Sequence, residues 1–326
     1  MEKKTIIVTG VAGFIGSNLC GKLLEMGHKV IGIDNFSYGF ERNIGNYRSN
    51  ENFQFIEGNL LNEKTLEKLQ GEVIVHLASQ KIPRYENALR TLEENSGMLK
   101  SIMSKSIKDK IKIVYASTSD VYGKNPILPY NEESDLVIGP TTVKRWAYAI
   151  SKIYGEQYII ANGSEYDLDY TIMRFFGSYG PNQNTTWWGG PQSVFIQNAL
   201  NNEPMEIHGD GSQTRTFTYI DDTVQGILKC IFHKDSSKEI FNIAAKPDTE
   251  ITILDLAKLI WKLIRPDDKE PKFHFIPYST FGKYEDVKRR VPDIDKIKEK
   301  LGFQPIYALQ DGLIKTIEWQ RNLSSD

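Results

Sequence analysis

The chain has 326 residues, a hydrophobic fraction of 40% and a formal net charge of −2, with a pI near 6.3. This length suffices for one large domain or two smaller ones with a buried core, and the balanced charge argues against a general nucleic-acid-binding or membrane-binding surface. No apolar run approaches the roughly 18 residues of a membrane span, and the two cysteines, Cys20 and Cys230, predict no disulfide framework. We expect a cytoplasmic protein without a signal peptide, a metal site, a membrane partner or a nucleic-acid partner.

The first predicted element is a buried strand at residues 4–9, and a glycine-rich loop follows it directly. Gly10, Gly13 and Gly16 permit a tight turn, a close approach of the backbone to a pyrophosphate, and close packing of the helix predicted at residues 17–26. The amide groups at the start of such a helix favour an anion. The loop therefore predicts a dinucleotide-binding site.

The next strand, predicted at residues 29–33, ends in Asp34. A carboxylate at this point accepts hydrogen bonds from the ribose hydroxyls of adenosine and repels a 2′-phosphate. The sequence therefore predicts NAD rather than NADP as the cofactor.

Further strands are predicted at residues 53–57, 73–78, 111–116 and 170–175. They alternate with helical stretches, which predicts an α/β fold with a parallel sheet covered on both faces, a doubly wound Rossmann fold. His76 lies within the fourth strand, where we expect it to be a core residue rather than a catalytic one.

Tyr148 and Lys152 lie four residues apart in a predicted helix and therefore on one helical face. An ammonium group near a phenol lowers the phenol's pKa, which gives a proton-transfer group suited to alcohol-to-ketone chemistry. The hydroxyl cluster 117–123 follows the fifth strand, and its Thr118 can share a proton with the substrate hydroxyl and the tyrosine. A second Tyr-x-x-x-Lys, at 284–288, lies in a polar stretch before Pro292.

Together these features resemble the extended short-chain dehydrogenase/reductases, and specifically the NAD-dependent nucleotide-sugar epimerase/dehydratase family. The resemblance rests on the glycine motif, Asp34, the hydroxyl residue before Val121-Tyr122-Gly123, and Tyr148-x-x-x-Lys152. It continues through the segments 174–181, 209–222, 290–295 and 301–303, so it covers nearly the whole chain.

The resemblance implies an NAD-binding Rossmann domain at residues 1–175, with a return segment at about 216–243. A smaller C-terminal lobe, at about 176–215 and 244–326, would hold a UDP-sugar substrate. The helices near 85–107 and 145–162 correspond to those that form a four-helix interface in family homodimers, so we expect a homodimer.

The resemblance also assigns site residues. The expected catalytic residues are Thr118, Asp120, Tyr148 and Lys152. The expected cofactor-binding residues, besides Tyr148 and Lys152, are Gly10, Gly13, Phe14, Ile15, Gly16, Asp34, Asn35, Asn59, Leu60, Leu77, Ala78, Ser79, Lys81 and Asn95. The expected substrate-binding residues are Lys81, Ser119, Gly177, Arg215 and Arg290, with the two arginines at the diphosphate because a forked guanidinium suits phosphate oxygens.

Two features depart from the family pattern. Family members usually carry an asparagine that touches the substrate where this chain has Gly177. The loop 183–191 contains two adjacent tryptophans, Trp187 and Trp188, which either form a lid that stacks on a base or sugar, or pack at a dimer contact.

The shared first step of the family would transfer a hydride from sugar C4 to NAD, with Tyr148 removing the hydroxyl proton. The resulting 4-ketone acidifies the hydrogen at C5, and Asp120 either moves that proton or only stabilises the turn after the strand. Retaining 4,6-dehydratases have Thr-Asp-Glu and decarboxylases Thr-Ser-Glu where this chain has Thr118-Ser119-Asp120. The run Arg145-Trp146-x-Tyr148 is similar to the decarboxylases, and the segment 76–84 resembles the UDP-N-acetylglucosamine 5,6-dehydratase of tunicamycin biosynthesis.

We therefore expect an enzyme of surface-glycan biosynthesis that acts on a UDP-sugar, with UDP-N-acetylhexosamine as the leading substrate. Transient C4 oxidation would precede C5 epimerisation, or the formation or reduction of a 5,6-ene. A UDP-hexose 4-epimerase, a UDP-glucuronate-type decarboxylase and a non-catalytic NAD-binding regulator remain open as alternatives.

Overall fold

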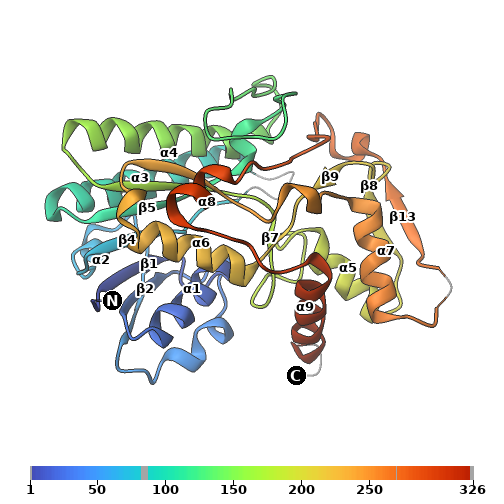
Figure 1. The fold of residues 1–326 in the computed structure, drawn as a ribbon, viewed down its shortest axis with the longest axis horizontal. Coiled ribbons are helices and arrows are strands. Elements are labelled where there is room, and N and C mark those ends of the chain that lie inside the picture. The colour runs from blue at the N-terminus through green and yellow to red at the C-terminus, as the bar shows by residue number, and fades with distance from the viewer. Residues whose placement is uncertain (1, 82–86, 269, 324–326) are drawn as a thin grey trace.

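The computed structural model of the protein describes residues 2–81, 87–268 and 270–323. Its centre is a seven-stranded parallel sheet with the strand order β11-β6-β5-β4-β1-β2-β3 (Figure 1). The strands are β1 (Thr5–Thr9), β2 (Lys29–Asp34), β3 (Phe53–Glu57), β4 (Val73–His76), β5 (Lys112–Thr118), β6 (Tyr170–Phe175) and β11 (Glu239–Ile243). The strand order changes direction between β1 and β4, so the loops after these strands diverge and leave a crevice where ligands bind in such folds. The predicted doubly wound Rossmann fold is confirmed.

Helices cover both faces of the sheet, which is why its strands are apolar on both sides. Ile6 and Val8 of β1 point into one core, and Ile7 points into the other. The first core lies under α1 (Phe14–Glu25) and α6 (Ile220–Phe232). The second lies under α2 (Glu63–Leu66), α3 (Ala88–Asp109) and α4 (Trp146–Glu165). His76 is buried and its Nδ1 lies 2.9 Å from the Thr9 hydroxyl, so its core position is confirmed.

A smaller set of elements gathers at one end of the molecule (Figure 1). It contains the helices α5 (Pro191–Leu200), α7 (Ile253–Ile264) and α9 (Leu309–Leu323), and the strand pair β8 (Met205–His208) and β13 (Phe273–Ile276). Two short pairs connect it to the sheet, β7 (Ser178–Tyr179) with β10 (Thr218–Tyr219), and β9 (Thr214–Arg215) with β12 (Ile251–Thr252). Short 3₁₀ turns are η1 (Glu41–Asn43), η2 (Gly45–Tyr47), η3 (Ser119–Tyr122), η4 (Lys234–Ser236), η5 (Pro247–Thr249) and η6 (Tyr278–Phe281).

The element boundaries differ from the sequence-based ones in informative ways. The helix α1 begins at Phe14, inside the glycine motif, and not at residue 17. The strand β5 continues to Thr118, so the hydroxyl cluster begins on the strand itself. The helix α8 (Asp295–Leu301) packs against β11 and not with the lobe, and Lys296 and Lys300 pair with Glu239 there. Among the described residues, no helix combines the length and apolar character needed to cross a bilayer.

A buried ion pair fixes α4 against the sheet. Arg174 of β6 donates hydrogen bonds to both carboxylate oxygens of Glu156 on α4, at 3.0 and 2.7 Å. The same guanidinium donates to the Tyr122 hydroxyl and the Glu132 carbonyl, each at 3.0 Å, and the Ser117 hydroxyl donates to Glu156. Strands β5 and β6 are thereby linked to the helix that carries Tyr148 and Lys152.

We predict that Arg174→Met lowers the free energy of unfolding by about 3–5 kcal/mol, because it leaves the Glu156 charge buried without its partner. Urea denaturation followed by circular dichroism measures the change. Arg289→Met is the matched control, since Arg289 pairs with Glu250 at the surface and its loss should change stability little. Equal destabilisation by the two substitutions would contradict a special structural role for the buried pair of Arg174 and Glu156.

Candidate active site

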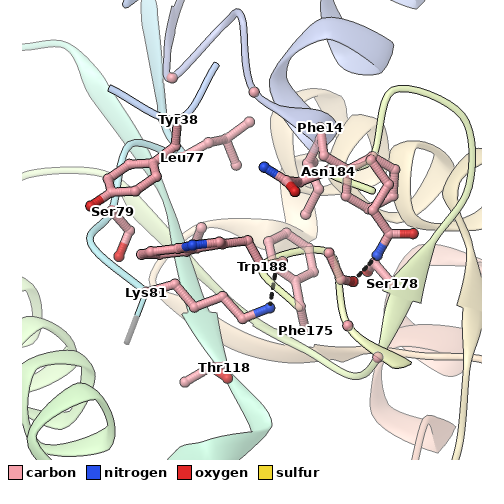
Figure 2. Close-up of a pocket in the computed structure, with 18 of the residues that line it drawn as sticks. Phe14, Tyr38, Leu77, Ser79, Lys81, Thr118, Phe175, Ser178, Asn184 and Trp188 are labelled. Atoms are coloured by element: carbon pink, nitrogen blue, oxygen red, sulfur yellow. Dashed lines mark hydrogen bonds between the residues drawn. The ribbon is translucent and has the colours of Figure 1, made fainter. Parts of the chain in front are cut away.

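A cavity of about 530 Å³ opens at the carboxyl ends of β1, β2, β4 and β5 and extends towards the lobe. Figure 2 shows Leu77, Phe14 and Thr118 placed around Trp188, and all four line the cavity. All expected catalytic and substrate-binding residues line the cavity, as do the expected cofactor-binding residues except Asn59, Leu60 and Asn95.

The glycine loop is shaped so that a ligand can approach its backbone. Gly10 has a φ of +71°, and a Cβ there would lie 3.0 Å from the Ala78 nitrogen. A Cβ on Gly16 would lie 2.2 Å from the Gly10 carbonyl oxygen, so the turn closes tightly on the first turn of α1. No side chain caps α1, which leaves its first amides available to an anion at the cavity wall. These features fit the pyrophosphate of a dinucleotide.

Asp34 lies at the end of β2, next to this loop. Its two carboxylate oxygens accept hydrogen bonds from the Ala12 and Phe36 amides, both at 2.9 Å, and each oxygen retains acceptor capacity towards the cavity. Burial raises the pKa of Asp34, and the backbone donors partly offset that effect. The position fits the ribose-binding role that the sequence predicts.

The reactive groups Thr118, Tyr148 and Lys152 meet where β5 ends against α4. The hydroxyls of Ser79 and Thr118 lie near the Tyr148 phenol and act to lower its pKa. The Lys152 ammonium donates to the Ala116 carbonyl at 2.7 Å and lies 5.9 Å from the centroid of the Tyr148 ring. The arrangement brings two hydroxyls and a lysine around one phenol, which suits proton transfer from a substrate alcohol.

The expected lowering of the Tyr148 pKa by Lys152 is not produced by the protein's own groups. Burial raises the pKa of Tyr148 and the charge of Asp120 adds to that rise, while the Ser79 and Thr118 hydroxyls offset only part of it. Burial also lowers the pKa of Lys152 to about 7, against the opposing effect of Glu156, so Lys152 is only partly charged at neutral pH. The predicted cofactor NAD⁺ would supply a hydride acceptor and a further positive charge.

Asp120 is held between two arginines. Its Oδ1 atom accepts hydrogen bonds from Arg290 and from Arg145, the latter at 3.2 Å. Burial by itself raises the pKa of Asp120, but the charges of Arg290, Arg145 and Arg215 outweigh it and the pKa is lowered. Nearby, Arg215 forms its own ion pair with Asp286 at 2.9 Å. Asp120 is thus a fixed carboxylate, ionised at neutral pH, in the same cavity as Tyr148.

Sequence comparison agrees with this geometry, since residues 6–244 match the NAD dependent epimerase/dehydratase family. The chain belongs to this family. The UDP-N-acetyl-alpha-D-glucosaminuronate decarboxylase of Bacillus cytotoxicus is 33% identical over 328 residues, which cover 99% of this chain and 100% of that protein.

Solved structures of the family superpose over almost the whole chain. The UDP-glucose 4-epimerase of Thermotoga maritima, solved with UDP-glucose, has a TM-score of 0.87 and 32% identity, covering 98% of this chain and 99% of that one. The UDP-glucuronic acid 4-epimerase of Bacillus cereus, solved with UDP-glucuronic acid and NAD, has a TM-score of 0.86 and 28% identity, covering 98% and 99%. The protein is therefore an NAD-dependent nucleotide-sugar enzyme of the epimerase, dehydratase and decarboxylase type.

Three expected cofactor-binding residues lie outside the cavity lining. Asn95 is buried, accepts hydrogen bonds from the Gln80 amide at 2.7 Å and the Ser79 hydroxyl at 3.2 Å, and donates to Gln80 and Ser151 at 3.0 Å each. Its amide is therefore used to hold the loop after β4 against α4. Asn59 accepts from the Leu61 amide, and Leu60 is buried. In the structure these residues shape the wall beside the cavity, and their contact with the cofactor stays a prediction.

The departure at Gly177 has a steric cause. The residue has a φ of +46°, and a Cβ there would lie 2.6 Å from the Thr216 carbonyl oxygen. The close approach of the two backbone segments excludes a side chain, so this position offers only main-chain atoms to a ligand. Among the described residues, no group of three or more His, Cys, Asp or Glu side chains is arranged to hold a metal ion.

The two adjacent tryptophans face different parts of the molecule. Trp187 stacks on His208 of the lobe with ring centroids 4.3 Å apart. Trp188 lies against Tyr38 with centroids 4.4 Å apart, and its carbonyl accepts a hydrogen bond from Lys81 at 3.3 Å (Figure 2). The loop thus spans the cavity from the lobe to the Rossmann domain. For Trp188 this geometry favours the lid over the ligand cavity rather than the dimer contact. Sequence reasoning missed Tyr38, since a lone exposed tyrosine carries no signal without its spatial partner.

We predict that Trp188→Ala accelerates NAD dissociation about three- to tenfold, the effect of losing an aromatic contact of about 0.5–1.5 kcal/mol. Stopped-flow displacement of the bound dinucleotide measures the rate. Trp188→Phe keeps a ring against Tyr38 and is expected to stay near the wild-type rate. An unchanged rate in the alanine variant would show that Trp188 does not hold the cofactor.

Proposed function

We propose that the protein oxidises C4 of a UDP-hexose transiently and then moves a proton at C5 with Asp120, with a UDP-N-acetylhexosamine as the expected substrate. The observation that carries this proposal is the ionised Asp120 carboxylate, which Arg145 and Arg290 hold in place. Asp120 and Tyr148 both line the same cavity. A group that only stabilised the turn after β5 would need no arginine partners.

In the proposed cycle Tyr148, assisted by Thr118, accepts the proton of the 4-hydroxyl while the hydrogen on C4 leaves as a hydride to NAD⁺. The 4-ketone then acidifies the C5–H bond, and the Asp120 carboxylate accepts that proton. Delivery of a proton from water to the other face gives C5 epimerisation. Transfer of the Asp120 proton to the C6 hydroxyl, which leaves as water, gives a 5,6-ene. Return of the hydride to the sugar restores NAD⁺.

Arg215 and Arg290 are the proposed partners of the substrate diphosphate. Both line the cavity, and both are partly buried guanidinium groups of a kind that can bind two phosphate oxygens at once. Lys81 and Ser119 are proposed to contact the sugar, and Gly177 is proposed to contribute its backbone. The solved Thermotoga maritima and Bacillus cereus relatives contain UDP-sugars, which supports the same nucleotide here.

A second candidate is decarboxylation of a UDP-uronate. The Nε atom of Arg290, which lines the cavity beside Asp120, is buried without a hydrogen-bond partner among the described residues, and a substrate carboxylate would supply one. The decarboxylase of Bacillus cytotoxicus and the UDP-glucuronic acid decarboxylase 1 of Danio rerio, 34% identical over 98% of this chain, support this candidate. It uses the same C4 oxidation, after which the bond to the carboxylate breaks and not the C5–H bond.

We predict that Asp120→Asn reduces exchange of deuterium into C5 at least about 100-fold, because it removes the proton acceptor, while reduced cofactor still forms. The enzyme is incubated in D₂O with UDP-N-acetylglucosamine, UDP-glucose or UDP-glucuronate and followed by proton NMR and absorbance of the reduced cofactor. Tyr148→Phe is expected to lose both signals, and Tyr154→Phe, further along the same helix, neither.

Each other result favours a different function. Inversion at C4 without deuterium at C5, and unaffected by Asp120→Asn, would indicate a 4-epimerase. Release of carbon dioxide from UDP-glucuronate would indicate the decarboxylase. Unchanged biological function in cells that carry Tyr148→Phe would support the non-catalytic regulator.

We also infer a homodimer through α3 and α4. These helices pack side by side and expose Leu89, Leu92, Ile150 and Tyr154, with 63% of Leu89 exposed. Apolar side chains gathered on two adjacent helices are typical of a subunit interface.

We predict that Ile150→Glu converts a dimer into a monomer in sedimentation velocity, because it places a charge in the apolar contact. The control Ile127→Glu changes a residue that is 71% exposed and lies on neither helix, and it should leave the dimer intact. A monomeric wild-type protein would overturn the inference.

A further inference from the structure

Arg145 occupies a position that the stability of the fold does not explain. It is the N-cap residue of α4, where the positive end of the helix dipole disfavours a cation. Its side chain is only 13% exposed, and the Nη1 atom is buried without a hydrogen-bond partner among the described residues. A buried charge and an unsatisfied donor are each unfavourable, so a specific partner must compensate them.

That partner is Asp120, whose carboxylate lies 3.2 Å from the Arg145 Nη2 atom. Two aromatic rings hold the guanidinium in place, with its central carbon 4.6 Å from the centroid of Trp146 and 5.7 Å from that of Tyr284. Arg145 directly precedes the helical turn that carries Tyr148. It therefore couples the position of Asp120 to the helix that bears the proton-transfer tyrosine.

The two arginine partners of Asp120 differ in their access to a ligand. Arg290 lines the cavity, whereas Arg145 lies behind Asp120 and is not among the lining residues. A substrate diphosphate that binds Arg290 competes with Asp120 for that guanidinium. Without another partner Asp120 would then be a buried carboxylate with no fixed counter-ion.

We propose that Arg145 is the permanent counter-ion and positioning residue of Asp120, and that it keeps this carboxylate ionised and aimed at the cavity when a substrate diphosphate draws Arg290 away. Only one part of this proposal, the loss of Arg290 from Asp120 when substrate binds, rests on the proposed diphosphate-binding role of Arg290. The pairing of Arg145 with Asp120 is tested without any diphosphate.

The charged and titratable groups that face Asp120 are Arg145 and Tyr148 of α4, Arg215 of β9, and Arg290 of the segment before α8. Asp286 acts on Asp120 indirectly, because it faces both Arg215 and Arg145. Loss of Arg290 alone should leave Asp120 ionised. Loss of both Arg290 and Arg145 should let burial dominate and raise the pH at which Asp120 titrates.

The experiment follows the carboxyl carbons of aspartate-labelled protein by ¹³C NMR from pH 3 to pH 8, with Asp120→Asn identifying the signal. We expect the midpoint of Asp120 in Arg290→Met to stay near the wild-type value. In Arg290→Met with Arg145→Met it should rise by about one pH unit or more. Equal midpoints in these two proteins would overturn the proposal.

Three controls separate charge from folding and from diphosphate binding. Arg289→Met, which removes the neighbouring guanidinium paired with Glu250, should not move the midpoint. If the methionine variants do not fold, Arg290→Gln with Arg145→Lys should keep the wild-type midpoint and Arg290→Gln with Arg145→Gln should raise it, and equal midpoints would again overturn the proposal. Added UDP should raise the midpoint in Arg145→Met but not in the wild type. A rise in the double variant without an effect of UDP would support the role of Arg145 and refute the diphosphate-binding role of Arg290.

Discussion

The buried pair of Arg174 and Glu156 determines where the chemistry of this protein takes place. It fixes α4 against β5 and β6. Arg145 is the N-cap of α4, which carries Tyr148 and Lys152, while Thr118 ends β5 and Asp120 lies in the adjoining turn η3. Proton transfer needs donor and acceptor within hydrogen-bond distance, so a shift of the helix by even one ångström would separate the two halves of the site. A buried ion pair is a weak source of net stability, but its fixed geometry sets the position of the helix.

Burial is the largest influence on the titration of the groups in this site. It raises the pKa of Tyr148, lowers that of Lys152 to about 7, and would raise that of Asp120 if the arginines did not outweigh it. Groups balanced in this way respond strongly when a charged ligand enters, because a new charge in a water-excluded site is poorly screened. The protonation states during turnover therefore depend on the bound cofactor and substrate as much as on the protein.

The sequence was sufficient to predict the fold and most of the cavity lining, because those features depend on local patterns. Alternating apolar strands, glycine spacing and the four-residue separation of Tyr148 and Lys152 are all legible along the chain. The sequence did not reveal the pairing of Arg145 with Asp120, the contact of Tyr38 with Trp188, or the hydrogen bonds of Asn95 to Gln80 and Ser151. Each of these depends on contacts between segments far apart in the chain. The same holds for the hydrogen bond between Asp120 and Arg290. The strand β11 was not predicted as a separate strand, because its pairing with β6 depends on the return of the chain to the sheet.

The backbone contact between Gly177 and Thr216 has a consequence for substrate range. The family resemblance predicts an asparagine amide at this point, and a polar group that binds a substrate hydroxyl discriminates strongly against analogues that lack it. Here no side chain fits, so the sugar substituent that faces Gly177 meets only main-chain atoms and is distinguished mainly by its size. Selectivity between sugars that differ in that substituent is therefore expected to be low, whereas selectivity at C4 and C5 would be set by Tyr148 and Asp120 in the proposed cycle.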